Sequence, residues 1–197
     1  MHPPGQSARL NLGGFPPNST MGAYMAISPA RRLDLVAAIG LAIGGALGLA
    51  GTFVGQAELR QILWAIDGVG LVVATALLAV KFLRKGDDCV AAGFLVFVAG
   101  ESLLLSGNAA GLDGSVPSYA GGIALWSASL LLTSIPKTFA LWTRLAGAAA
   151  AILFAITAAR ISWGDHLLPT SAPLPSLGYP FLVLTFAGWI WALLKEE

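Results

Sequence analysis

Six long apolar runs dominate this chain of 197 residues. A helix needs about 20 mainly apolar residues to cross the roughly 30 Å hydrocarbon core of a bilayer. The runs approach that length, are rich in alanine, leucine and glycine, and lack the alternation of a barrel strand. They predict transmembrane helices at about 35–54, 62–80, 89–105, 119–135, 145–162 and 179–194. We therefore expect an all-α, polytopic integral membrane protein in which six transmembrane helices form a bundle.

Charged residues are too scarce for a soluble fold. They make up 11% of the chain, against about 25% in an average soluble protein, whereas hydrophobic residues make up 56%. The single cysteine, Cys89, excludes an internal disulfide and a thiolate metal cluster. A net charge of +1 argues against a nucleic-acid partner. The expected partner is the lipid bilayer, and a partner membrane protein or a homo-oligomer stays open.

Basic residues predict the orientation of the bundle. If the N-terminus is cytoplasmic, nine of them lie on the inner side and only Arg60 and Arg160 lie on the outer side. The positive-inside rule therefore predicts that the N- and C-termini are both cytoplasmic. The setting expected is the plasma membrane, in particular a bacterial inner membrane. Tryptophans are expected to form interfacial belts, with Trp64 and Trp163 outside and Trp142, Trp189 and Trp191 inside.

The chain divides into two parts by composition. Residues 1–33 are rich in proline and glycine, which predicts a disordered cytoplasmic arm. Residues 34–197 hold all six apolar runs and form the predicted transmembrane domain.

Glycines recur at helical spacing in two of the predicted spans. Gly40, Gly44 and Gly48 lie four residues apart in the first, and Gly93 and Gly100 lie seven apart in the third. Lipid tails are as apolar as leucine, so helices in a membrane associate through close backbone approach at small residues. We expect these glycines to pack helices within the bundle rather than to form a dimer interface.

Asp67 and Glu101 are the two acidic side chains inside otherwise apolar runs. An acidic side chain at the centre of a lipid-facing helix costs about 2.5–3.5 kcal/mol on insertion scales, so both should face the bundle interior. The short turn between the second and third spans makes these helices antiparallel neighbours. Counting about 1.5 Å per residue from that turn places both carboxyls in the outer half of the membrane, at similar depth.

Two interpretations of these carboxyls compete. In the functional one, Asp67, Glu101 and Asn108 line a polar pocket, with Arg160 on the same outer side, and the carboxyls exchange a proton or bind a cationic ligand. In the structural one, Asp67 or Glu101 pairs with Arg160 or caps a broken helix. The sequence favours the structural interpretation slightly, because a residue near a helix start reaches interfacial water.

The longest outer loop, residues 161–178, is a candidate lid. It contains Trp163, Asp165 and His166 together with several prolines that stiffen it. His166 beside Asp165 can titrate or contribute a metal ligand, although a lone loop histidine is more often exposed and without a role.

The scarcity of histidine and cysteine and the absence of catalytic motifs argue against most classes of membrane enzyme. With only two histidines and one cysteine, it has neither a bis-histidine haem site nor a dithiol centre, and no zinc or nucleophile motif appears. The sequence thus predicts no cofactor, no metal and no catalytic residue. The leading hypothesis is a non-enzymatic integral subunit, sensor or scaffold. The alternatives are a small proton- or cation-coupled transporter that uses Asp67 and Glu101, and a membrane enzyme that acts on a lipid or quinone.

Overall fold

The apolar runs form helices along nearly their whole length in the computed structural model, which describes residues 28–195. Within that range there is no strand. The elements are α1 (Pro29–Phe53), α2 (Ala57–Arg84), α3 (Asp88–Asn108), the single turn α4 (Gly111–Gly114), α5 (Val116–Ser134), α6 (Leu141–Ser162) and α7 (Gly178–Lys195). The predicted disordered arm of residues 1–33 is wrong at its end, because residues 29–33 form the first turn of α1, and residues 1–27 lie outside the described residues.

Most helices extend beyond the apolar runs that predicted them. The second run, 62–80, becomes a helix from Ala57 to Arg84 that includes charged residues at both ends. A helix that continues into the interface keeps its backbone groups hydrogen-bonded, while long charged side chains reach water. Local signals set the starts: Ser28 caps α1 by accepting a hydrogen bond from the Arg31 amide, and Pro29 is its first residue.

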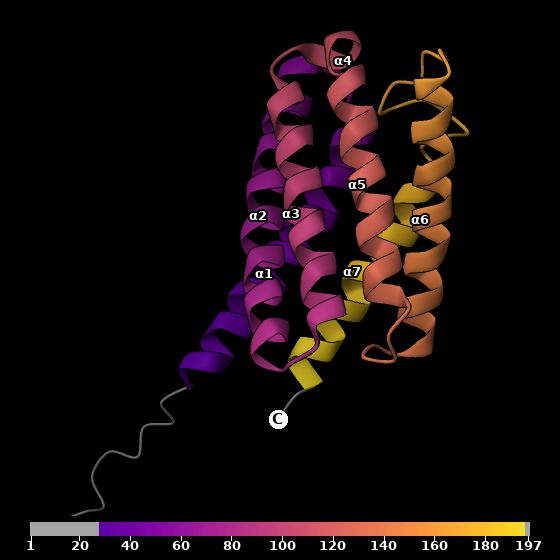
Figure 1. Ribbon diagram of the computed structural model, residues 1–197. Coiled ribbons are helices and arrows are strands. Elements are labelled where there is room, and N and C mark those ends of the chain that lie inside the picture. Colours follow the sequence, from indigo (N-terminus) through magenta and orange to yellow (C-terminus); the bar gives the residue numbers. More distant parts are fainter. Residues whose placement is uncertain (1–27, 196–197) are drawn as a thin grey trace, which may run out of the picture.

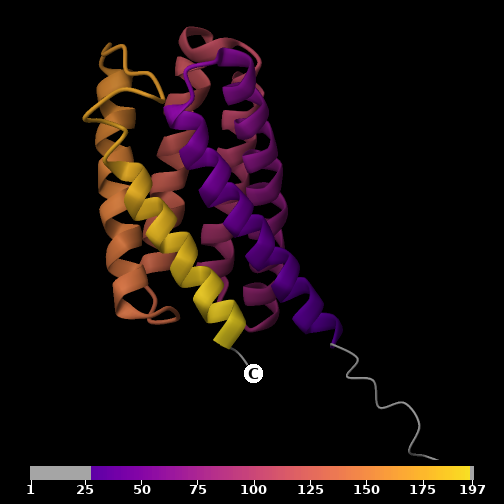
Figure 2. The ribbon, with the colours of Figure 1, turned by 180° about the vertical axis from the view of Figure 1, so that it is seen from behind.

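The six long helices form a closed ring (Figures 1 and 2). Each packs against its neighbours in the order α1, α2, α3, α5, α6 and α7, and α7 returns to contact α1. All six are long and apolar enough to cross a membrane. The two ends of the described chain lie together at one end of the bundle, called here the terminal end, and α4 lies at the opposite, distal end (Figure 1).

The outer surface of the ring is apolar on every helix. Large hydrophobic side chains are exposed on each of the six, for example Ile39, Val69, Leu95, Leu131, Ile152 and Leu184. A soluble protein would bury such residues, whereas lipid solvates them. The prediction of an all-α bundle of six transmembrane helices is confirmed.

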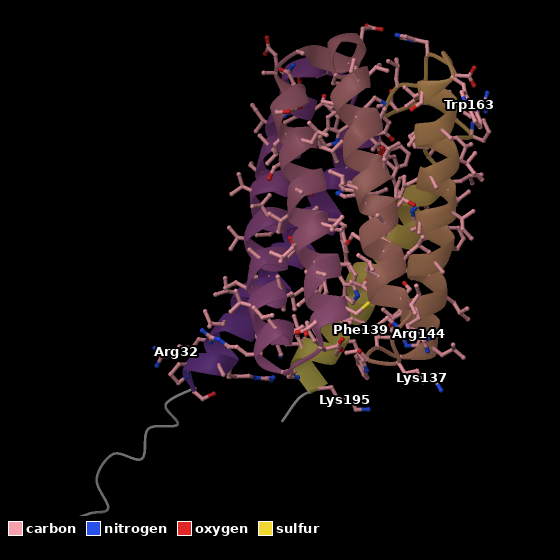
Figure 3. All side chains as sticks on the ribbon, in the orientation of Figure 1. Arg32, Lys137, Phe139, Arg144, Trp163 and Lys195 are labelled. Atoms are coloured by element: carbon pink, nitrogen blue, oxygen red, sulfur yellow. The ribbon has the colours of Figure 1, made fainter. Side chains whose placement is uncertain are left out.

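Basic side chains gather at the terminal end of the bundle. Figure 3 shows Arg32, Lys137, Arg144 and Lys195 there, with Trp163 at the distal end. Among residues 28–195, Arg60 and Arg160 are the only arginines or lysines in or beside the distal loops. The asymmetry inferred from the sequence is therefore present in three dimensions.

Three arginines bind the carbonyl groups at the C-terminal ends of neighbouring helices. The Arg31 guanidinium donates to Leu193 O at 3.0 Å, which fastens the start of α1 to the end of α7. Arg144 at the start of α6 donates to Ser134 O at 2.7 Å, and Arg60 in α2 donates to Val54 O at 2.6 Å. Carbonyls at a helix C-terminus lack intrahelical partners and carry negative partial charge, so guanidinium groups stabilise them.

Aromatic side chains fill the ring centre towards the terminal end. Phe94 and Trp189 meet edge to face at 4.8 Å between ring centroids, and Phe97 stacks on Trp126 at 5.3 Å. Trp189 is only 1% exposed. Its predicted place in an interfacial belt is therefore wrong: its position on α7 turns it towards Phe94 and Phe97 rather than outwards.

Glycines on α1 let its backbone lie directly on α2. A Cβ atom at Gly40 would lie 2.6 Å from the Gly70 carbonyl oxygen, and one at Gly48 would lie 2.6 Å from the Asp67 carboxyl oxygen Oδ2. Between α3 and α5, Cβ atoms at Gly93 and Gly100 would meet Thr133 and the Gly122 carbonyl at 2.7 and 2.8 Å. These glycines lie at contacts inside the ring.

We expect Gly40→Ala to destabilise the bundle although alanine favours helix. Its methyl group would meet the Gly70 backbone, which can move away only if α1 and α2 separate. Overpacking of this kind costs about 1–3 kcal/mol. The thermal midpoint of the purified protein in detergent should fall. The control is Gly45→Ala on the same helix, where the nearest atom lies at an ordinary 3.4 Å. Equal midpoints for the two variants would contradict close packing of α1 on α2.

Candidate functional site

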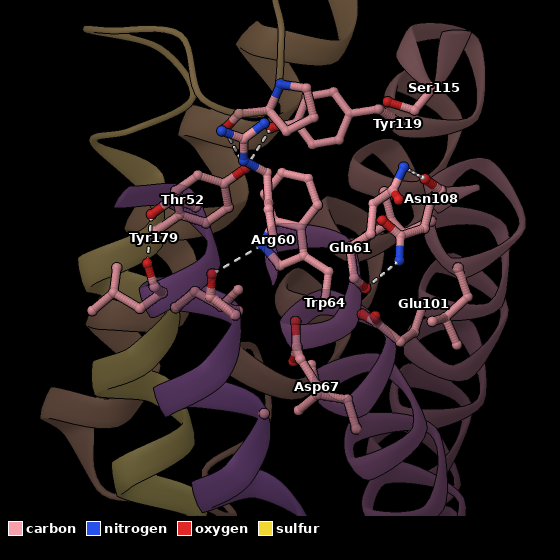
Figure 4. Close-up of a pocket in the computed structure, with 18 of the residues that line it drawn as sticks. Thr52, Arg60, Gln61, Trp64, Asp67, Glu101, Asn108, Ser115, Tyr119 and Tyr179 are labelled. Atoms are coloured by element: carbon pink, nitrogen blue, oxygen red, sulfur yellow. Dashed lines mark hydrogen bonds between the residues drawn. The ribbon is translucent and has the colours of Figure 1, made fainter. Parts of the chain in front are cut away.

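A cavity of about 300 Å³ lies inside the distal half of the ring (Figure 4). Residues of α1, α2, α3, α4, α5 and α7 line it, and Pro169 from the loop before α7 contributes to its wall. Its polar lining residues are Thr52, Arg60, Gln61, Asp67, Glu101, Asn108, Ser115, Tyr119 and Tyr179. Most of the remaining wall is leucine, glycine and aromatic rings. The cavity thus combines a few polar groups with a mainly apolar surface, as small-molecule sites do.

Asp67 enters the cavity from α2. Its side chain lies against the backbone of α1 at Gly48, where any larger residue would occupy the space of the carboxyl group. The residue is 8% exposed, and its Oδ1 atom is buried with no hydrogen-bond partner. The glycine face of α1 therefore covers Asp67 and separates it from lipid.

Glu101 enters from α3, across the cavity from α1. Its neighbour Gly100 packs on the Gly122 carbonyl of α5, which turns the glutamate towards the ring centre. Glu101 is 3% exposed, and its Oε2 atom is buried without a partner. The Trp126 indole lies beside the Glu101 carboxyl as a nearby donor, but its buried Nε1 forms no well-aligned hydrogen bond.

The two carboxyl groups share one electrostatic environment. They lie close enough for the charge on Glu101 to act on Asp67, and both face the cavity (Figure 4). Arg60 is the one basic residue among those that line the cavity. Its Nη2 is bonded to Val54 O, its Nε is buried without a partner, and it forms no ion pair with either carboxyl. The site therefore holds two acidic groups with no counter-ion among the described residues.

Asn108 and Gln61 fasten the distal ends of α2 and α3 to each other. The Asn108 amide donates to Gln61 O at 2.8 Å, and the Gln61 amide donates to Asn108 O at 3.3 Å. This reciprocal pair holds the helices that carry Asp67 and Glu101 at a constant separation. Asn108 was proposed from the sequence as a site residue, and it lines the cavity, with its amide engaged in this contact.

Two tyrosines form a hydrogen-bonded chain beside the cavity. The hydroxyl groups of Tyr119 in α5 and Tyr179 in α7 are 2.9 Å apart, and the Tyr179 hydroxyl donates to Pro169 O at 2.9 Å. Since a hydroxyl has one proton to donate, Tyr119 donates to Tyr179. These hydrogen bonds connect α5 and α7 to the loop of residues 163–177, which runs down along α6 before α7 begins (Figure 2).

Arg160 does not join the carboxyls, so its predicted pairing with Asp67 or Glu101 is wrong. Its Nε bonds to Asp165 Oδ2 at 2.6 Å, and both side chains are nearly half exposed. The position of Arg160 at the end of α6 directs it to its own loop rather than to the ring centre. The alternative that a carboxyl caps a broken helix is also wrong, because α2 and α3 continue unbroken past residues 67 and 101.

The residues proposed as a lid do not cover the cavity. Trp163 is 85% exposed, and His166 lies 3.6 Å from Asp113 of α4 at the surface. Asp165 is held by Arg160. The loop reaches the cavity instead through Pro169, which is buried. In the described part of the chain, no three His, Cys, Asp or Glu side chains converge as metal ligands.

Sequence reasoning missed Tyr119, Tyr179, Trp126 and Arg60 as lining residues. The two tyrosines resemble interfacial anchors because each stands at the start of an apolar run. Trp126 alone offered a signal, since it is the one tryptophan that falls deep within a predicted span.

Together, the fold and the cavity define a multi-pass helical membrane protein with an acidic cavity inside its bundle. Comparisons with protein-family models, with curated proteins and with solved structures gave no match.

We expect Tyr179→Phe to loosen the loop of residues 163–177. The change removes the hydrogen bonds to Pro169 and to Tyr119, each worth about 0.5–1.5 kcal/mol. Hydrogen–deuterium exchange in detergent should become faster in this loop. Tyr119→Phe is the matched control because it leaves the bond to Pro169 in place, and it should accelerate exchange less. Equal protection from exchange in the wild type and both variants would show that the tyrosine hydrogen bonds do not hold the loop.

Proposed function

We propose that the protein is a small membrane carrier that takes up a proton or a monovalent cation in the cavity between Asp67 and Glu101. The observation behind this proposal is the burial of two carboxyl groups with partnerless oxygen atoms in one cavity. An ionised carboxylate without a counter-charge is costly in such surroundings, so each group needs a proton or a cation. A cavity that must acquire positive charge to be stable is suited to cation handling.

The charged and titratable groups around the site are few. On α2 they are Arg60 and Asp67, on α3 Glu101, on α5 Tyr119, and on α7 Tyr179. The residues that α1 contributes, such as Gly44, Gly48 and Thr52, carry no ionisable side chain. The two carboxyls are thus the acidic groups through which a change of pH would act on the cavity.

Transport requires the cavity to open towards the terminal end as well. Trp126 and Phe186 line the cavity and belong to the aromatic cluster that fills the ring centre below it. Repacking of these rings is the movement that a carrier would need. The same cluster favours the second candidate, a sensor or integral subunit that binds at the cavity without transport, because fully packed aromatic cores resist rearrangement.

Proton flux in liposomes tests the carrier. Reconstituted protein should dissipate an imposed pH gradient faster than protein-free vesicles, as read by a pH-sensitive dye inside. Asp67→Asn combined with Glu101→Gln should reduce the rate to the protein-free value, because neither carboxyl can then exchange a proton.

Asp113→Asn is the matched control, since Asp113 is an acidic residue at the same end of the bundle but is 82% exposed. It should keep the wild-type rate. Wild-type protein that carries neither protons nor monovalent cations into the vesicles would exclude the carrier and leave the sensor or subunit. Full flux in the double variant would show that the carboxyls are not the proton site.

We also propose that both termini are cytoplasmic and that the cavity lies in the outer half of a plasma membrane, such as a bacterial inner membrane. The gathering of basic residues at the terminal end supports this orientation.

Cysteine labelling in intact cells tests the orientation. Cys89→Ser removes the single cysteine, after which Lys137→Cys or Trp163→Cys places one at either end of the bundle. A membrane-impermeant maleimide should label Trp163→Cys directly and Lys137→Cys only after permeabilisation. The opposite pattern would invert the orientation.

A further inference from the structure

We propose that the cavity binds a protonated organic amine with a compact apolar body. This rests on the proposed function in one respect: the cavity is a cation site. It adds the chemical class of the cation, which follows from the distribution of polar and apolar groups over the wall.

The acceptors in the cavity suit an ammonium group. Asp67 Oδ1 and Glu101 Oε2 are buried acceptors on adjacent helices and receive no well-aligned hydrogen bond, although the Trp126 indole lies beside Glu101. A protonated amine has N–H donors for them and a positive charge that balances a carboxylate. An inorganic cation needs more oxygen ligands, and in the described residues no third acidic side chain joins the pair.

The rest of the wall suits an apolar body. Trp64, Tyr119, Trp126, Tyr179 and Phe186 bring five aromatic rings to the cavity. Aromatic faces attract an organic cation, most strongly in a site from which water is removed. A small hydrated ion would not contact the ring faces that line the cavity.

Aliphatic side chains line the cavity from several helices. They are Leu49, Leu71, Leu104, Leu105, Leu112, Leu182 and Val183. The volume of about 300 Å³ lies at the lower limit of small-molecule sites, which favours a compact amine over a long-chain one.

Binding to the purified protein in detergent tests this inference without reference to transport. The probes are phenethylamine and cyclohexylamine, each compared with the alcohol of the same shape, phenethyl alcohol or cyclohexanol, and with potassium chloride. Calorimetry and tryptophan fluorescence report binding, because Trp64 and Trp126 line the cavity. We expect saturable binding of at least one amine and none of its alcohol or of potassium.

Variants locate the site. Glu101→Gln should weaken amine binding by at least about tenfold, because it removes one of two buried charged partners. Val183→Trp should abolish binding by filling part of the cavity from α7. Its control, Leu184→Trp, changes a side chain that is 50% exposed on the same helix and should bind like the wild type. If Glu101→Gln does not fold, the comparison of Val183→Trp with Leu184→Trp still tests whether the amine binds in the cavity.

The outcomes separate this inference from the proposed function. Amine binding without flux of either protons or the amine in liposomes supports the ligand class and excludes the carrier. Proton flux without amine binding supports the carrier and overturns the ligand class. Equal affinity for amine and alcohol, or binding of potassium alone, would also overturn it.

Discussion

The contact between the glycine face of α1 and α2 is the constraint on which the site depends. Side chains at Gly40 and Gly48 would strike the Gly70 backbone and the Asp67 carboxyl, so any larger residue would move α1 away. The space opened in this way would admit lipid to an acidic side chain that is costly to expose there. Close approach in this bundle therefore does more than stabilise a pair of helices, because it encloses a carboxyl group that could not otherwise lie in the membrane.

Side chains fill the centre of the ring less completely in its distal half than in its terminal half, and this difference creates the cavity. Aromatic side chains such as Phe94 and Trp189 occupy the terminal half, where α1 and α7 are joined by Arg31. In the distal half, glycines of α1 and the late start of α7 leave less side-chain volume. Polar contacts hold that half open: Asn108 with Gln61 between α2 and α3, and the tyrosine chain between α5, α7 and the loop.

The candidate site was predictable in part. Asp67 and Glu101 stand out because an ionisable residue in an apolar run has few acceptable environments, and the short turn between their helices sets their relative depth. Arg160, a charged residue at the end of the fifth predicted span, was expected on the same side of the membrane as the carboxyls, yet it bonds to Asp165. A charge at a helix end has water and its own loop as alternative partners, so its position along the chain does not determine what it contacts. Tyr119 and Tyr179 gave no signal, because a tyrosine at a span end is equally suited to the interface.

The sequence alone determined the class of fold. In lipid, an apolar run of this length can satisfy its backbone hydrogen bonds by forming a helix, and six such runs give six membrane-spanning helices. It also determined that two acidic side chains must face inwards. Only the tertiary structure decided which groups surround them, because contacts between α2, α3, α5 and α7 depend on the order of helices around the ring and on the rotation of each about its axis. Neither is encoded in the spacing of residues along a single helix, and together they bring two separate acidic residues to one cavity.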